Sequence, residues 1–72
     1  MFGGDTMKID RQKLLLTMAR ACMSPADLQT ATQLPRPTLN NAMGGRGIRP
    51  GTLGKIAKAL SVDPEEIIEK EV

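Results

Sequence analysis

Residues 23–45, MSPADLQTATQLPRPTLNNAMGG, decide the fold of this chain. Their first part carries the signals of a helix start: Ser24 is a capping residue, Pro25 suits the first helical position, and Asp27 places an acid in the first turn. The helix is expected to run to about Thr32, because the short turn QLPR follows it.

A second helix follows this turn. It is predicted to start at Pro37, because a proline disfavours the α region for the residue before it, Arg36. Gly44 and Gly45 supply the stop, so this helix lasts only about two turns. Two short helices joined by a tight turn form the unit that places its second helix in the major groove of DNA.

The second helix has two unlike sides. Consecutive residues of an α-helix are turned by about 100°, which places Leu39, Ala42 and Met43 together on an apolar side. The opposite, outer side then carries Pro37, Asn40 and Asn41. Asparagine is a poor helix former, so helix propensity does not explain the adjacent pair. Its amide can pair bidentately with the edge of adenine. We therefore interpret Asn40 and Asn41 as candidates for reading bases, with two ordinary surface asparagines as the alternative.

A preceding helix is predicted from its cap, Asp10, to about Cys22. The residues that share its inner face by helical spacing are Leu14, Thr17, Met18 and Ala21. Leu15 and Leu16 fall off this face; core packing under the C-terminal helix is expected, with a partner surface as the alternative. Residues 1–8 are expected to be a flexible tail, and residues 9–72 the domain.

Two further helices are predicted after residue 45. Pro50 starts the first of them, and its apolar stripe consists of Leu53, Ile56, Ala57 and Leu60. Asp63, Pro64 and Glu66 supply the cap, first-turn proline and N3 acid of the last helix, which continues through Ile67 and Ile68. The expected fold class is all-α, a compact bundle of five helices.

Composition limits the class of protein. A chain of 72 residues makes one domain and has little room for a deep enzymatic cleft. Histidine is absent, and the GGRG run at residues 44–47 lacks the Lys-Ser/Thr of a phosphate-binding loop, so we expect no enzyme and no cofactor. Cys22 has no partner for a disulfide or metal site, which indicates that the protein is in a reducing compartment. We interpret Cys22 itself as a small core residue. Without a long apolar run, no signal peptide or membrane span is predicted, and the protein is expected in the cytoplasm.

The charges are unevenly distributed although the net charge is only +2. Residues 35–58 contain five basic side chains and no acid: Arg36, Arg46, Arg49, Lys55 and Lys58. Most of the acids lie in residues 59–72. A basic block of this kind indicates a polyanionic partner, with a solvated basic surface as the alternative.

Residues 23–68 resemble the Cro/C1-type, or xenobiotic-response-element-type, helix-turn-helix family, and the resemblance extends over about residues 9–69. The strongest matches are Met23-Ser24, Leu28, Leu34, Thr38-Leu39, Gly45, Thr52-Leu53 and the run KIAKALSVDPEEII. The resemblance implies a lambda-repressor-like five-helix domain that binds double-stranded DNA with its third helix, usually as a homodimer on a two-fold operator.

The resemblance also implies roles for individual residues. Those at positions where the family reads bases are Arg36, Pro37, Asn40 and Asn41. Those at positions where it commonly holds phosphates are Thr38, Arg46 and Arg49. The amino ends of the second and fourth helices would also face the DNA backbone, and Ser24 belongs to the first of these. Pro25 stands where the family often has glutamine, so fewer contacts are expected from the second helix.

The expected function is therefore that of a sequence-specific DNA-binding transcriptional regulator, a repressor, acting as a homodimer on a palindromic operator. No membrane and no small-molecule ligand are implied. The dimer surface is expected after the fourth helix, at Val62, Ile67 and Ile68. The alternative is a protein-interaction module of the same fold, an antitoxin-like or anti-repressor partner, which exposed Leu15 and Leu16 together with absent DNA binding would favour.

Overall fold

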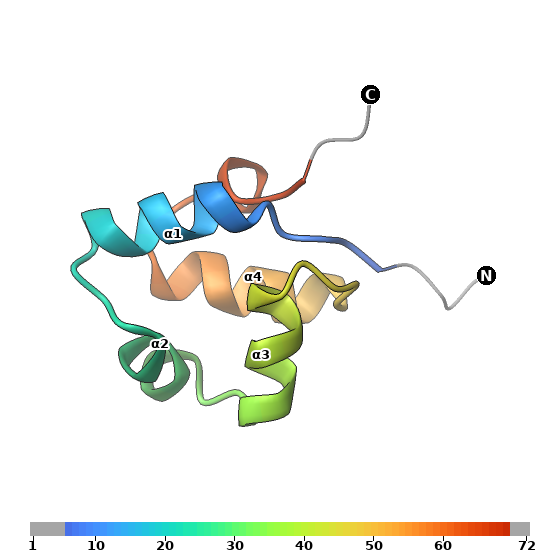
Figure 1. Cartoon of the computed structure of the whole chain (residues 1–72), viewed down its shortest axis with the longest axis horizontal. Coiled ribbons are helices and arrows are strands. Elements are labelled where there is room, and N and C mark those ends of the chain that lie inside the picture. Colours follow the sequence, from blue (N-terminus) through green and yellow to red (C-terminus); the bar gives the residue numbers. More distant parts are fainter. Residues whose placement is uncertain (1–5, 70–72) are drawn as a thin grey trace.

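The computed structural model describes residues 6–69 of the chain (Figure 1). These residues form four α-helices and one 3-10 helix: α1 (Arg11–Arg20), α2 (Pro25–Thr32), α3 (Arg36–Met43), α4 (Pro50–Ala59) and η1 (Pro64–Glu66). In Figure 1, α4 lies in the middle of the molecule, between α1 on one side and α2 and α3 on the other. The predicted all-α class is confirmed.

The prediction of a fifth α-helix is wrong. Its start signals are present, because Asp63 and Glu66 form a reciprocal capping box, but the helix ends after one 3-10 turn. The backbone that follows pairs with the segment before α1 instead: the N–H of Asp10 donates to the carbonyl of Ile67, and that of Glu69 to the carbonyl of Lys8, both at 2.8 Å. These hydrogen bonds take the place of the backbone hydrogen bonds that a longer helix would make. Ile67 is buried in this arrangement.

The segment before α1 makes two isolated antiparallel bridges, Met7 with Ile48 and Ile9 with Ile68. The bridge to Ile48 has two hydrogen bonds, one in each direction, of 2.8 Å each. The first five residues of the predicted tail lie outside the described part, and the domain boundary remains a prediction. At Met7, however, the chain is already attached to the loop before α4.

Three of the helices end in the same kind of turn. The residue after the cap is left-handed at Cys22 (φ 56°), Gly45 (φ 80°) and Ser61 (φ 58°). The N–H of the next residue then donates back into the helix, from Met23 to Met18, from Arg46 to Asn41 and from Val62 to Ala57, at 3.0 Å each. This Schellman arrangement satisfies carbonyls at the helix end. It also ends α1 two residues before the predicted Cys22.

The core is built from aliphatic side chains of all four α-helices and of the segments that flank them. Its residues are Ile9, Leu14, Met18, Leu28, Leu34, Leu39, Ala42, Ile48, Leu53, Ile56, Ala57, Leu60 and Ile67. The predicted stripe of α4 and the inner face of α1 at Leu14, Thr17 and Met18 are confirmed.

Four residues predicted to be buried are exposed. Ala21 and Cys22 lie past the end of α1, in the turn that leaves the helix. Leu15 and Leu16 are 53% and 63% exposed, because α1 presents a single stripe to the core and the short η1 segment does not cover its other side. No helix within residues 6–69 is both long and apolar enough to cross a membrane.

Candidate nucleic-acid interface

The helix α3 begins one residue earlier than predicted, at Arg36. The carbonyl of Pro35 accepts the first intrahelical hydrogen bond, from the N–H of Leu39 at 3.0 Å. Arg36 and Pro37 therefore fill the first two helical positions, where an N–H needs no intrahelical partner and a proline is tolerated. The helix ends at Met43, before the predicted glycine stop.

The two unlike sides of α3 are confirmed. Leu39 and Ala42 are buried and Met43 is half-buried. The opposite side carries the four residues predicted to read bases, which are all exposed: Arg36, Pro37, Asn40 and Asn41. This side of the helix is available for contact with a large ligand.

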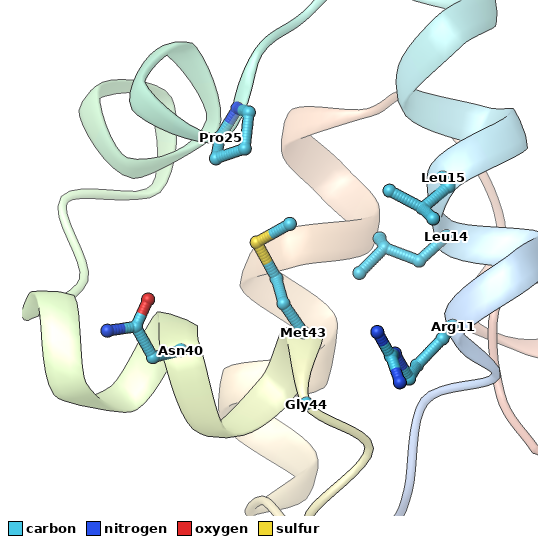
Figure 2. A pocket seen from close by; sticks show the side chains of 7 residues that line it. All are labelled: Arg11, Leu14, Leu15, Pro25, Asn40, Met43 and Gly44. Carbon is cyan, nitrogen blue, oxygen red and sulfur yellow. The ribbon is translucent and has the colours of Figure 1, made fainter.

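Two open hollows of about 440 Å³ each flank the exposed side of α3. The α2-side hollow is lined by Arg11, Leu14, Leu15, Pro25, Asn40, Met43 and Gly44 (Figure 2). The α4-side hollow is lined by Thr6, Thr38, Asn41, Gly47, Ile48, Arg49 and Thr52. Because consecutive helical residues are turned by about 100°, Asn40 lines the first hollow and Asn41 the second.

The α4-side hollow is lined by residues whose side chains are able to bind an anion. These residues carry three hydroxyls, one amide and one guanidinium: Thr6, Thr38, Thr52, Asn41 and Arg49. The start of α4 lies at the same place, and its cap residue Arg49 makes no side-chain capping bond. Unpaired N–H groups in a first helical turn carry partial positive charge and attract anions.

Two lining residues of this hollow were not predicted from the sequence. Thr52 belongs to the first turn of α4, so the predicted anion-binding helix start is the signal that could have identified it. Thr6 has no local signal, because the Met7–Ile48 bridge brings it there from a distant part of the chain. A Cβ on Gly47 would lie 2.8 Å from the Thr6 hydroxyl oxygen, so any other residue at position 47 would force Thr6 to shift.

The start of α2 differs from that of α4, because its polar groups bond to one another. The Ser24 hydroxyl oxygen accepts from the N–H of Asp27 at 3.2 Å, and the Asp27 carboxylate accepts from the N–H of Ser24 at 3.0 Å. Hydrogen bonding to the carboxylate, first from the Ser24 N–H and then from the Ser24 side chain, lowers the pKa of the exposed Asp27 carboxyl below its usual value of 3.8. Pro25, at the first helical position, has no N–H.

Arg11 supplies the cation of the α2-side hollow, and the sequence did not single it out. Its Cγ and Cδ atoms lie close to Gly45, 3.8 and 3.7 Å from where a Cβ of that residue would be. Figure 2 shows the guanidinium turned from α1 toward the end of α3. The near-neutral charge of residues 1–34 gave no indication of this position.

The structure brings only some of the predicted site residues together; Arg36 and Pro37, at the start of α3, line neither hollow. Thr38, Asn41 and Arg49 line one hollow together, while Asn40 lines the other. Ser24 caps α2. Arg46 is exposed in the loop after α3 and lines neither hollow.

Comparison with known proteins identifies the domain. Residues 13–71, well over half of the chain, match the Cro/C1-type HTH DNA-binding domain. The chain belongs to this family. No curated protein matches it significantly.

Three solved structures resemble this Cro/C1-type domain. A mutant hydroxyethylphosphonate dioxygenase (TM-score 0.76, 27% identity) and native PhpD with cadmium atoms (TM-score 0.75, 26% identity) each align with 92% of the chain. The chain spans only 14% of the length of each of those two proteins. The transcriptional regulator VanUg, at 20% identity and TM-score 0.76, shares the fold over 96% of this chain and 92% of its own.

Proposed function

We propose that this Cro/C1-type domain is a sequence-specific transcriptional regulator, a repressor, that inserts α3 into the major groove of double-stranded DNA. The observation that carries the proposal is the exposed side of α3, with its two adjacent amides between two hollows that each contain an arginine. An α-helix with its side chains is about 10–12 Å across, and the major groove is about 12 Å wide.

The chemistry of each side chain decides whether it is assigned to bases or to phosphates. Asn40 and Asn41 read base edges, since an amide both donates and accepts, and Arg36 and Pro37 contact bases at the start of the helix. Thr38, Arg46 and Arg49 bind phosphates, and the uncapped start of α4 adds its N–H groups. Ser24 is assigned to a phosphate through its hydroxyl hydrogen, because its oxygen already accepts from Asp27.

The regulator acts as a homodimer on a palindromic operator, with half-sites about 34 Å apart, because so small a domain contacts too few base pairs alone. The expected dimer surface needs correction: Ile67 is completely buried and belongs to the core, whereas Val62 and Ile68 are half-buried. A cytoplasmic location and the lack of enzymatic activity, cofactor, small-molecule ligand and membrane association belong to the same proposal.

Selection from a random pool of DNA duplexes tests this function. We expect the protein to enrich a palindrome whose half-sites are one helical turn apart, and light scattering to give two chains per duplex. Enrichment of an asymmetric site by one chain would refute the dimer. Binding without any enrichment would refute sequence-specific regulation.

A second function is favoured by one observation, the exposure of Leu15 and Leu16 on α1. Exposed leucines on a small domain can form a protein-interaction surface, as in an antitoxin-like or anti-repressor partner. This function predicts that Leu15→Ser with Leu16→Ser abolishes binding to the partner protein, while Asn41→Ala does not. The DNA-binding function predicts that Asn41→Ala weakens binding to the selected duplex, while the two leucine substitutions do not.

A further inference from the structure

We infer that Arg11 is a DNA-backbone contact, whose guanidinium binds a phosphate on the α2 side of α3. This inference rests on the proposed function and adds a residue to it. Arg11 lies on the first turn of α1, outside the helix-turn-helix unit, and lines the α2-side hollow together with Pro25 and Asn40 (Figure 2).

Beyond the Ser24 hydroxyl, which is assigned to a phosphate above, the start of α2 offers few groups that could hold one. Two of its N–H groups, those of Ser24 and Asp27, donate to side chains within the capping box. Pro25 has no N–H to offer. The Asp27 carboxylate is exposed and ionised at neutral pH, so it repels a phosphate at this helix end.

Arg11 has the position and the chemistry that the start of α2 lacks. Its aliphatic stem lies beside Gly45, and the residue is exposed, so the charged end can reach a ligand outside the domain. A guanidinium donates through a planar fork that matches two phosphate oxygens. Less side-chain freedom is lost on binding when the stem is already packed.

The charge distribution around α3 supports the same assignment. Arg49 lines the hollow on the α4 side, and Arg11 is the cation of the hollow on the α2 side. A major groove has a phosphate backbone along each edge, so a helix within it needs a positive group on both sides. Arg11 completes this pair.

The test compares Arg11→Met with Arg20→Met. Methionine keeps an aliphatic stem beside Gly45 and removes the charge. Arg20 is exposed in the last turn of the same helix and lines neither hollow, so its substitution removes the same charge elsewhere. Dissociation constants are measured between 50 and 200 mM salt for the selected duplex and for an unrelated duplex.

We expect Arg11→Met to weaken binding to both duplexes by roughly tenfold at 0.1 M salt. The plot of the logarithm of the association constant against the logarithm of the salt concentration should become shallower by about one unit of slope. Arg20→Met should behave like the wild type, and both variants should keep the melting temperature. Arg11→Lys should recover the slope but only part of the affinity, because an ammonium lacks the fork.

The outcomes separate this inference from the proposed function. A wild-type protein that prefers its selected duplex, combined with an unchanged affinity and slope for Arg11→Met, would overturn the inference alone. A loss confined to the selected duplex would overturn it too, because Arg11 would then read a base. A wild-type protein without any preference would overturn the proposed function first.

Discussion

Alanine substitution of Asn40 and Asn41 separates DNA reading from folding. Both side chains are exposed on α3, opposite the buried Leu39 and Ala42, so truncation opens no cavity. Alanine is the better helix former by up to about 0.7 kcal/mol per residue. We therefore expect each variant to keep or slightly raise the free energy of unfolding.

Binding should change much more than stability. A bidentate amide–adenine pair contributes about 1–3 kcal/mol of discrimination. Its loss should raise the dissociation constant for the selected duplex by about 5- to 150-fold. Because the two amides line hollows on opposite sides of α3, the two variants should lose preference at different base pairs of each half-site. Affinity for unrelated DNA should remain nearly constant.

Fluorescence anisotropy on a set of duplexes, each with one base pair changed, measures these effects. Gln12→Ala is the matched control, because Gln12 is an exposed helical residue that lines neither hollow. If the double variant Asn40→Ala, Asn41→Ala melts like the wild type and keeps its full preference, then α3 is not the reading element.

Three further predictions concern single residues. Arg46→Ala and Arg49→Ala should each weaken binding to all duplexes alike and reduce the salt slope by about one unit; an unchanged slope in both would make them solvated surface charges. Since folding lowers the pKa of Asp27 below 3.8, its stabilising contribution is full above the unfolded-state pKa and is lost as the pH falls through the folded-state pKa. The difference in free energy of unfolding between the wild type and Asp27→Asn, measured in urea, should therefore be constant above about pH 5 and shrink in stronger acid; a difference that grows there would contradict this sign. Ser61→Gly should raise the free energy of unfolding by up to about 1 kcal/mol, because Ser61 is left-handed, and a lower melting temperature would show that its side chain stabilises the turn.

Local signals in the sequence were sufficient wherever neighbouring residues determine the backbone. The caps Asp10 and Ser24, the glycine stop after α3 and the apolar stripe of α4 all act within one or two helical turns. The sequence could accordingly predict the position of α3 and its exposed side, which carries the four residues proposed to read bases.

Long-range contacts account for what the sequence did not predict. The capping box at Asp63 is present, but the backbone after it pairs with residues 8–10 and does not continue as a helix. Arg11 and Thr6 reach the two hollows only through tertiary packing. The exposure of Leu15 and Leu16 depends on how much of α1 the C-terminal segment covers, which no local pattern specifies.

The two bridges made by the segment before α1 have a mechanical consequence. Met7 pairs with Ile48 beside the α4-side hollow, and two residues later Ile9 pairs with Ile68. The same short segment is therefore held by both bridges. A tether that pulls on the chain ahead of Met7 would load the Ile48 bridge first and shift Thr6 away from Gly47, whereas a pull beyond Ile68 would load the other bridge. Fusion of a bulky domain through a short linker ahead of Thr6 should therefore disturb the α4-side hollow more than the same fusion after Glu69.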